Sequence, residues 1–215
     1  MKQIFREVFF FTQHNLTPML KIIGPYMLLL FCVGLPINYL DNETSDATWF
    51  YWLVAMFVQP IYMCRLIKYM KCISLNETPD LSVSFNEWLN LFTVYFLYHV
   101  VVMVGCIAFV IPGVYLAARY GFADFEAVLN KKQPMQSMQD SWVLTKSNVL
   151  ILILGIVIIM VTGLLINILL AFIGKINTEF LVLTNVISEL ISILYLVLIS
   201  VFYFRIYLLN NKITN

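Results

Sequence analysis

The stretch from Val149 to Ile173, VLILILGIVIIMVTGLLINILLAFI, contains no charged residue. A transmembrane helix needs about 20 mostly apolar residues to cross the hydrocarbon core of a bilayer, and this stretch exceeds that length. The rest of the chain has the same character, because 61% of its 215 residues are hydrophobic and only 12% are charged. A soluble domain carries about a quarter charged residues. The sequence therefore predicts an all-α integral membrane protein.

Six apolar stretches divide the chain. We expect them to form one transmembrane domain over residues 1–215, a six-helix bundle with short amphipathic helices at the membrane interface. The expected spans are 18–39, 49–70, 88–111, 113–130, 149–173 and 180–204. Only Pro112 and Gly113 separate the third span from the fourth, so a single kinked helix, with five spans in total, is the alternative. Residues 113–130 would form about 27 Å of helix, just enough for the hydrocarbon core.

The charges of the connecting segments favour six spans. Lys and Arg concentrate on the cytoplasmic side of membrane proteins. The charged residues of the first connection are all acidic. The Pro-Gly turn has no charge, and the connection after the fifth span has Lys175 and Glu179. Basic residues gather in the alternate segments: Lys2, Arg6 and Lys21, then Arg65, Lys68 and Lys71, then Lys131, Lys132 and Lys146, and finally Arg205 and Lys212. Six spans with both termini in the cytoplasm fit this alternation, whereas five spans would place Lys131, Lys132 and Lys146 outside.

Short amphipathic segments precede the first, third and fifth spans, at residues 3–16, from Ser84 onward, and at 135–148. Ser84 and Glu87 have the spacing of a capping box, which stabilises a helix N-terminus. This arrangement is compatible with three repeated units, each an interfacial helix followed by a hairpin. Polar inner loops of any hairpin array would look similar, and no residue-level repeat decides between the two interpretations.

Four charged residues inside the expected spans are the candidate functional residues: Arg119, Glu189, Asp124 and Glu126. An intramembrane charge is costly and is usually paired. Arg119 and Glu189 would lie about 10 and 14 Å below the outer face, at 1.5 Å per residue, so we expect an ion pair between them. The cluster is open to three interpretations: a substrate or proton site, a structural clamp between the fourth and sixth helices, or an Arg119 side chain that extends to the headgroups.

No pattern predicts a catalytic, cofactor or metal site. The cysteines are not spaced as a metal or redox motif, only His14 and His99 are available as histidine ligands, and no basic stretch is typical of nucleic-acid binding. His99, in the third span, fits either a proton relay or a histidine bonded to a neighbour. We therefore expect no enzymatic activity, no cofactor and no metal. The expected partners are the lipid bilayer and, as an alternative, other membrane proteins or further copies of this chain.

Two segments resemble a known family. They are Ile111–Tyr120, IPGVYLAARY, and Asp140–Asn148, DSWVLTKSN. The YciC-like family of six-helix bacterial inner-membrane proteins, and the related membrane domain of some glycerophosphodiester phosphodiesterases, similarly carry a Pro-Gly turn, an Arg a few residues later and a Ser-Trp-x-Leu-Thr-Lys-like segment. Members usually have Gly where this chain has Ser147. The resemblance is sharpest over 111–148 and rests on topology elsewhere.

The resemblance implies a bacterial inner-membrane location and a role in maintaining the cell envelope, and it transfers no catalytic residue. We expect a non-enzymatic membrane component that acts in envelope homeostasis or as a partner of other membrane proteins. The alternative is a small transporter or channel for a lipid or an anionic solute that uses Arg119. A membrane-embedded enzyme is the third hypothesis, and it would need a polar cluster at one depth, drawn from His99, Arg119, Asp124, Glu126 and Glu189.

Overall fold

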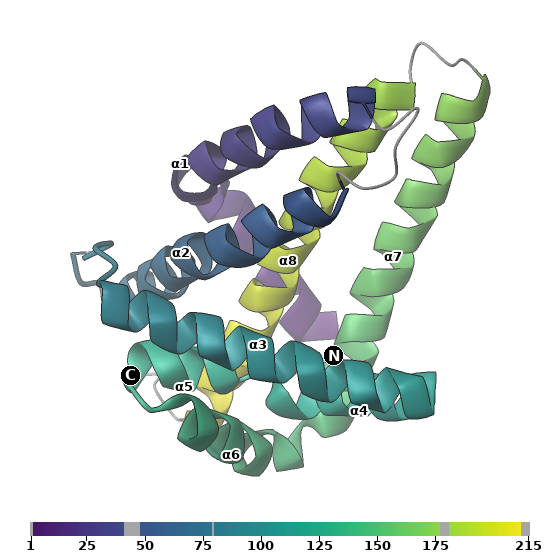
Figure 1. Ribbon diagram of the computed structural model, residues 1–215. Coiled ribbons are helices and arrows are strands. Elements are labelled where there is room, and N and C mark those ends of the chain that lie inside the picture. Colours follow the sequence, from purple (N-terminus) through teal and green to yellow (C-terminus); the bar gives the residue numbers. More distant parts are fainter. Residues whose placement is uncertain (1, 41–47, 79, 177–180, 212–215) are drawn as a thin grey trace.

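The computed structural model describes residues 2–40, 48–78, 80–176 and 181–211, which are helical or form short connections. Figure 1 shows the helices as one bundle. In chain order they are α1 (Lys2–Leu40), α2 (Thr48–Leu75), α3 (Phe85–Ala108), α4 (Val110–Tyr120), α5 (Ala123–Leu129), α6 (Pro134–Leu144), the 3₁₀ turn η1 (Thr145–Ser147), α7 (Val149–Ile176) and α8 (Leu181–Asn211).

Within the described residues, five helices are long and apolar enough to cross a membrane. The stretches that meet this condition are Gln3–Gly34, Trp49–Leu75, Phe85–Ala108, Val149–Gly174 and Leu183–Asn210. By helix length and hydropathy the chain is therefore a multi-pass membrane protein, as its composition predicts. The first of these stretches includes residues 3–16, which were expected to form a separate interfacial helix. Instead they are the beginning of α1, which continues to Leu40 and bends along its length (Figure 1).

The expected fourth span, 113–130, is wrong as a single continuous helix. The chain forms α4 over eleven residues and α5 over seven, with a turn at Gly121 and Phe122 between them. Eleven residues rise only about 16 Å, roughly half the hydrocarbon core. Together the two helices still bring the chain back along α3, because the Asn90 side-chain amide near the start of α3 donates a hydrogen bond to the Lys132 carbonyl (2.8 Å). The structure thus supports five spanning helices, and a sixth crossing made of α4 and α5 stays a prediction.

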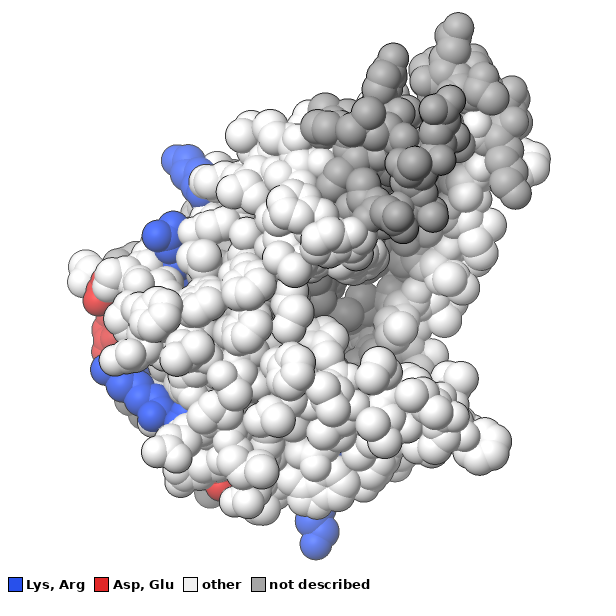
Figure 2. All heavy atoms as spheres, in the orientation of Figure 1, with Lys and Arg blue, Asp and Glu red and all other residues white. Residues whose placement is uncertain are grey.

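Ion pairs join the helix ends at one end of the molecule. Glu7 in α1 pairs with Arg205 in α8 (2.8 Å), and Lys68 in α2 pairs with Glu87 in α3 (2.9 Å). Glu87 also accepts a hydrogen bond from the Ser84 backbone N–H while its own N–H donates to Ser84 Oγ, so the predicted capping box is confirmed. Figure 2 shows the charged side chains gathered along one margin of this face, with an otherwise uncharged described surface.

Near this charged end, buried aromatic rings pack α5 and the turn before it against α8. Phe122 contacts the rings of Tyr203 and Tyr207, and Phe125 contacts Phe204 and Tyr207, with ring centroids 5.3–5.9 Å apart. Both phenylalanines are fully buried. Aromatic pairs at such distances contribute beyond the area that they bury, so this contact between α5 and α8 fixes the position of α5.

Two glycines allow α3 and α4 to approach each other closely. A Cβ added at Gly113 would meet the Cys106 side chain and would lie 3.0 Å from the Cys106 backbone N and 3.1 Å from its Cα. A Cβ added at Gly105 would lie 3.0 Å from the Gly113 Cα. Small residues at such contacts let helix backbones pack directly in membranes. This close approach turns the chain back within two residues of the end of α3.

We expect Gly113→Ala to destabilise the protein by about 1–3 kcal/mol, the usual range for overpacking, because α4 must move away from α3. The thermal unfolding midpoint in detergent micelles measures the effect. Gly24→Ala is the matched control, since no heavy atom lies within 4 Å of an added Cβ at Gly24 in α1. Its midpoint should stay unchanged or rise with the better helix propensity of Ala. Equal midpoints for the two variants would contradict the close contact.

Candidate functional site: an intramembrane cavity

The two segments that carry the family resemblance meet at the break between α4 and α5. The Ser141 hydroxyl donates to the Arg119 carbonyl (2.9 Å) and accepts from the Phe122 backbone N–H (3.0 Å). The Thr145 hydroxyl shares its one hydrogen between the same Arg119 carbonyl (3.0 Å) and the Ser141 carbonyl (2.7 Å). These hydroxyls, from α6 and η1, replace the helical hydrogen bonds that the backbone loses at the turn. That replacement is the physical reason why 113–130 does not continue as one helix.

Arg119 is packed against an aromatic ring. It is only 4% exposed, and its guanidinium carbon lies 4.1 Å from the centre of the Trp142 ring. Within the described part of the chain no carboxylate lies within ion-pair distance of Arg119, and its Nε has no hydrogen-bond partner. The cation–π contact and the C-terminal end of the α4 dipole both stabilise this charge. Arg119 therefore holds α4 against α6.

Glu189 lies in α8, but its side chain lies outside the described residues, so the expected Arg119–Glu189 pair stays a prediction. The contacts between α4 and α8 do not support the expectation that Arg119 and Glu189 lie at a similar depth in the membrane. The Tyr203 hydroxyl of α8 donates to the Ala117 carbonyl of α4 (3.3 Å), and Tyr203 follows position 189 by roughly 21 Å along the helix axis.

Glu126 is the centre of a hydrogen-bonded cluster that joins α5, α6 and α8. It is 1% exposed and accepts hydrogen bonds from the Tyr207 hydroxyl (2.8 Å) and the Asn130 amide (2.9 Å). It also pairs with Lys132 (2.6 Å), which pairs in turn with Asp140 (2.8 Å). Hydrogen bonds to Asp140 and Glu126 raise the pKa of the Lys132 ammonium above its usual value. A buried carboxylate with this many partners is a structural clamp and has little capacity left for a ligand.

Asp124, two residues earlier in α5, lies in a different environment. It lines a small compartment of about 100 Å³ between α2, α3, α5 and α8. A large compartment of about 500 Å³ adjoins it, between α1, α2, α3 and α8, and four residues line both: Gln59, Tyr95, His99 and Leu196.

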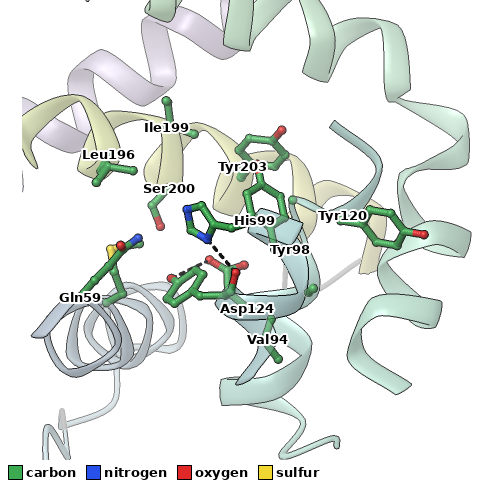
Figure 3. Close-up of a pocket in the computed structure, with 14 residues that line it drawn as sticks. Gln59, Val94, Tyr98, His99, Tyr120, Asp124, Leu196, Ile199, Ser200 and Tyr203 are labelled. Carbon is green, nitrogen blue, oxygen red and sulfur yellow. Dashed lines mark hydrogen bonds between the residues drawn. The ribbon is translucent and has the colours of Figure 1, made fainter. Parts of the chain in front are cut away.

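The small compartment is rich in polar groups (Figure 3). One Asp124 carboxylate oxygen, Oδ1, accepts from the Phe125 backbone N–H (2.8 Å), whereas Oδ2 lies 3.5 Å from the Tyr95 hydroxyl, at the limit of a hydrogen bond. His99 Nδ1 lies 2.6 Å from the Tyr95 carbonyl. Because a carbonyl can only accept, Nδ1 carries the proton of this bond. Other polar side chains of this lining are Gln59, Tyr98, Tyr120, Ser200 and Tyr203.

The large compartment is mainly apolar and aromatic. Its walls include Leu30 of α1, Ala55 and Met56 of α2, Phe96 of α3 and Ile193 of α8. Among the residues that the structure describes, no Lys or Arg lines either compartment. The cavity thus changes along its length, from an apolar part suited to hydrocarbon to a polar part with one carboxylate.

The polar groups do not form a catalytic relay in this structure. Ser200, His99 and Asp124 line the same compartment. Serine hydrolases use these three residue types. However, His99 Nδ1 binds the Tyr95 carbonyl and not a carboxylate, and the buried Ser200 Oγ has no hydrogen-bond partner among the described residues. Within the same described residues, no group of three His, Cys, Asp or Glu side chains could hold a metal ion.

The structure therefore separates residues that the sequence placed in one cluster. Of the three members whose side chains the structure describes, Arg119 packs on Trp142, Glu126 belongs to the clamp, and Asp124 alone lines the cavity. Tyr95 and Tyr98, which line the cavity beside Asp124, are not among the residues predicted from the sequence. The available signal was their spacing with His99, at positions i, i+3 and i+4, which places three polar groups on one face of an otherwise apolar helix.

No family model, curated protein or solved structure matches this chain. Its function is therefore inferred from the chemistry of the cavity and of the residues that position it.

We expect a coupling free energy of about 0.5–2 kcal/mol between Arg119 and Trp142, the range for a cation–π contact. The measurement is the unfolding free energy of Arg119→Gln, Trp142→Leu and the double variant, combined as a double-mutant cycle. The control is a double-mutant cycle of Arg119→Gln with Trp88→Leu, because Trp88 packs on Phe57 and Phe92 and not on Arg119. A second cycle with Glu189→Gln tests the competing ion pair. Coupling to Glu189 and none to Trp142 would contradict the assignment of Arg119.

Proposed function

We propose that this chain is a non-enzymatic, multi-pass protein of the bacterial inner membrane. In this proposal it binds an amphipathic, lipid-like molecule in the cavity formed by both compartments, between α1, α2, α3, α5 and α8, and through this binding contributes to cell-envelope homeostasis. The observation that carries the proposal is the cavity itself, in which an apolar compartment of about 500 Å³ adjoins a polar one of about 100 Å³. Ligand pockets in proteins typically have 300–1,000 Å³ and combine apolar walls with a few polar groups.

The position of the cavity supports a ligand that comes from the bilayer. Most of its walls belong to α1, α2, α3 and α8, which are long and apolar enough to span a membrane, and the large compartment includes Leu30, Tyr51 and Trp52 of α1 and α2. A hydrocarbon chain can lie there without losing the surroundings that it has in lipid, while its polar end reaches the hydrogen-bonding groups around Asp124. A purely polar solute would leave the apolar compartment unfilled.

The resemblance to YciC-like proteins supports the bacterial inner membrane as the location. The residues that carry it, Ser141, Thr145 and Arg119, shape the turn that places α5 beside the cavity. The alternative of an anion transporter that uses Arg119 gains no support from the geometry, because the described lining of both compartments lacks Arg119.

Filling the large compartment should prevent binding. We expect Ala55→Phe to reduce the amount of lipid-like material that stays bound to the purified protein by at least half, because the ring would occupy the space of the ligand chain. Native mass spectrometry after release from detergent micelles counts the bound molecules. The matched control is Ala171→Phe on the exposed surface of α7, which should leave the occupancy unchanged. Equal occupancy in wild type and Ala55→Phe would contradict binding in this cavity.

The proposed orientation makes a separate prediction. Reporters fused after Lys132 and after Asn215 should behave as cytoplasmic, with fluorescent GFP and inactive alkaline phosphatase, because the chain returns to the basic side after α5. The same reporters inserted into residues 41–47 should show the reverse pattern. Phosphatase activity after Lys132 would mean that α4 and α5 do not return the chain, and it would restore the five-span alternative.

A further inference from the structure

The charge of the described cavity lining is negative. Asp124 is the one acidic side chain among its described lining residues, and that lining has no Lys or Arg. An anionic headgroup would therefore enter without a counter-ion and would face a carboxylate. A cationic headgroup would instead meet an opposite charge in surroundings of low dielectric, where charge pairing is strong. The sign of the lining favours a cation over an anion.

The Asp124 carboxylate has unused capacity for such a partner. No Lys or Arg among the described residues pairs with it. Its Oδ2 has only the long contact to the Tyr95 hydroxyl. Glu126, in the same helix, is the internal comparison, because it has a Lys, an Asn and a Tyr within hydrogen-bonding distance. The protein thus neutralises one of these two carboxylates itself and leaves the other facing a cavity.

Aromatic rings form much of the rest of the small compartment. Tyr95, Tyr98 and Tyr203 line it together with His99, and Figure 3 shows Tyr98 and His99 beside Asp124. The ring of Tyr120, which also belongs to the lining, packs on Trp142 with ring centroids 5.3 Å apart. Ring faces attract ammonium and quaternary ammonium groups, and an aromatic cage is a recurrent site for them. Aromatic rings with a single carboxylate, and with no Lys or Arg among the described lining residues, suit an ammonium group better than a phosphate, which is typically bound by Arg and Lys.

We infer that the small compartment binds the ammonium end of a cationic amphiphile, with Asp124 as the counter-ion and the tyrosines as its walls, while the hydrocarbon chain lies in the large compartment. The inference rests on the proposed function, since it names the class of molecule that the cavity takes. A single-chain alkylamine or alkylammonium compound fits the charge of the lining directly. An amine-bearing phospholipid would bring its phosphate into a lining without basic groups, so the single-chain compound is the better fit.

The test measures the binding of a series of probes with the same chain length to the wild-type protein in nonionic maltoside micelles, by native mass spectrometry. The probes are dodecyltrimethylammonium, dodecylamine and the uncharged dodecanol, with tetramethylammonium as a headgroup without a chain and phosphatidylethanolamine as an amine-bearing lipid. We expect both cationic single-chain probes to bind at least tenfold more tightly than dodecanol. Tetramethylammonium and phosphatidylethanolamine should bind more weakly than dodecyltrimethylammonium.

Two variants complete the experiment. Asp124→Asn keeps the shape of the side chain and removes its charge, so it should weaken the binding of the cationic probes about tenfold or more and leave dodecanol within twofold. Asp80→Asn, in the exposed segment before α3, is the control and should bind like wild type. If Asp124→Asn does not fold, the selectivity of the wild-type protein alone decides the question.

Each outcome has a distinct meaning. Selective binding of cations that depends on Asp124 supports the inference. Equal binding of cationic and uncharged probes overturns it and leaves the proposed function in place. Tight binding of tetramethylammonium or phosphatidylethanolamine in place of the single-chain probes overturns the assignment of the ligand as a single-chain alkylamine or alkylammonium compound. Failure of every chain-bearing probe to bind contradicts the proposed function itself.

Discussion

The rest of this structure depends on how the backbone is satisfied where α4 ends and α5 begins. A helix broken inside an apolar bundle exposes carbonyl and N–H groups that have no water to bind. Here two hydroxyls, from Ser141 and Thr145, bind the Arg119 carbonyl, and Ser141 also accepts from the Phe122 N–H. These hydroxyls come from α6 and η1, which connect α5 to α7. This connection therefore also stabilises the turn between α4 and α5.

The turn decides the roles of the charged residues on both sides of it. Before the turn, Arg119 packs on Trp142 and fixes α4 to α6. After it, the chain begins α5 in a new direction, so Asp124 lines the cavity and Glu126 enters the clamp with Lys132 and Tyr207. A continuous helix would have kept Arg119 and Asp124 on one axis. The break therefore separates a structural cation from a carboxylate that is available to a ligand.

Much of the fold could be predicted from composition and charge, whereas the site could not. Apolar length predicted the long helices and the Ser84–Glu87 spacing predicted a cap, and the structure has both. The orientation inferred from the basic segments stays a prediction. The break was missed because residues 113–130 have the length of a span despite three charged residues, and the hydroxyls that stabilise the turn lie about twenty residues later. Asp124 was grouped with Arg119 for the same reason. The polar face of α3, with Tyr95, Tyr98 and His99, was visible in the sequence, but a cavity depends on how four helices pack.

The pairing of α1 with α8 has a consequence for the synthesis of the chain. Glu7 binds Arg205, 198 residues later, and Phe5 stacks on Phe202. At about 5–20 residues per second, a ribosome takes about 10–40 s to make the partner of the first turns of α1. During that time Val8 and its neighbours have no α8 to pack against, and a contact of such high sequence separation forms slowly. The nascent N-terminal helix therefore has to be held by lipid, by the insertion machinery or by α2 until the last helix arrives, and only then does the bundle close.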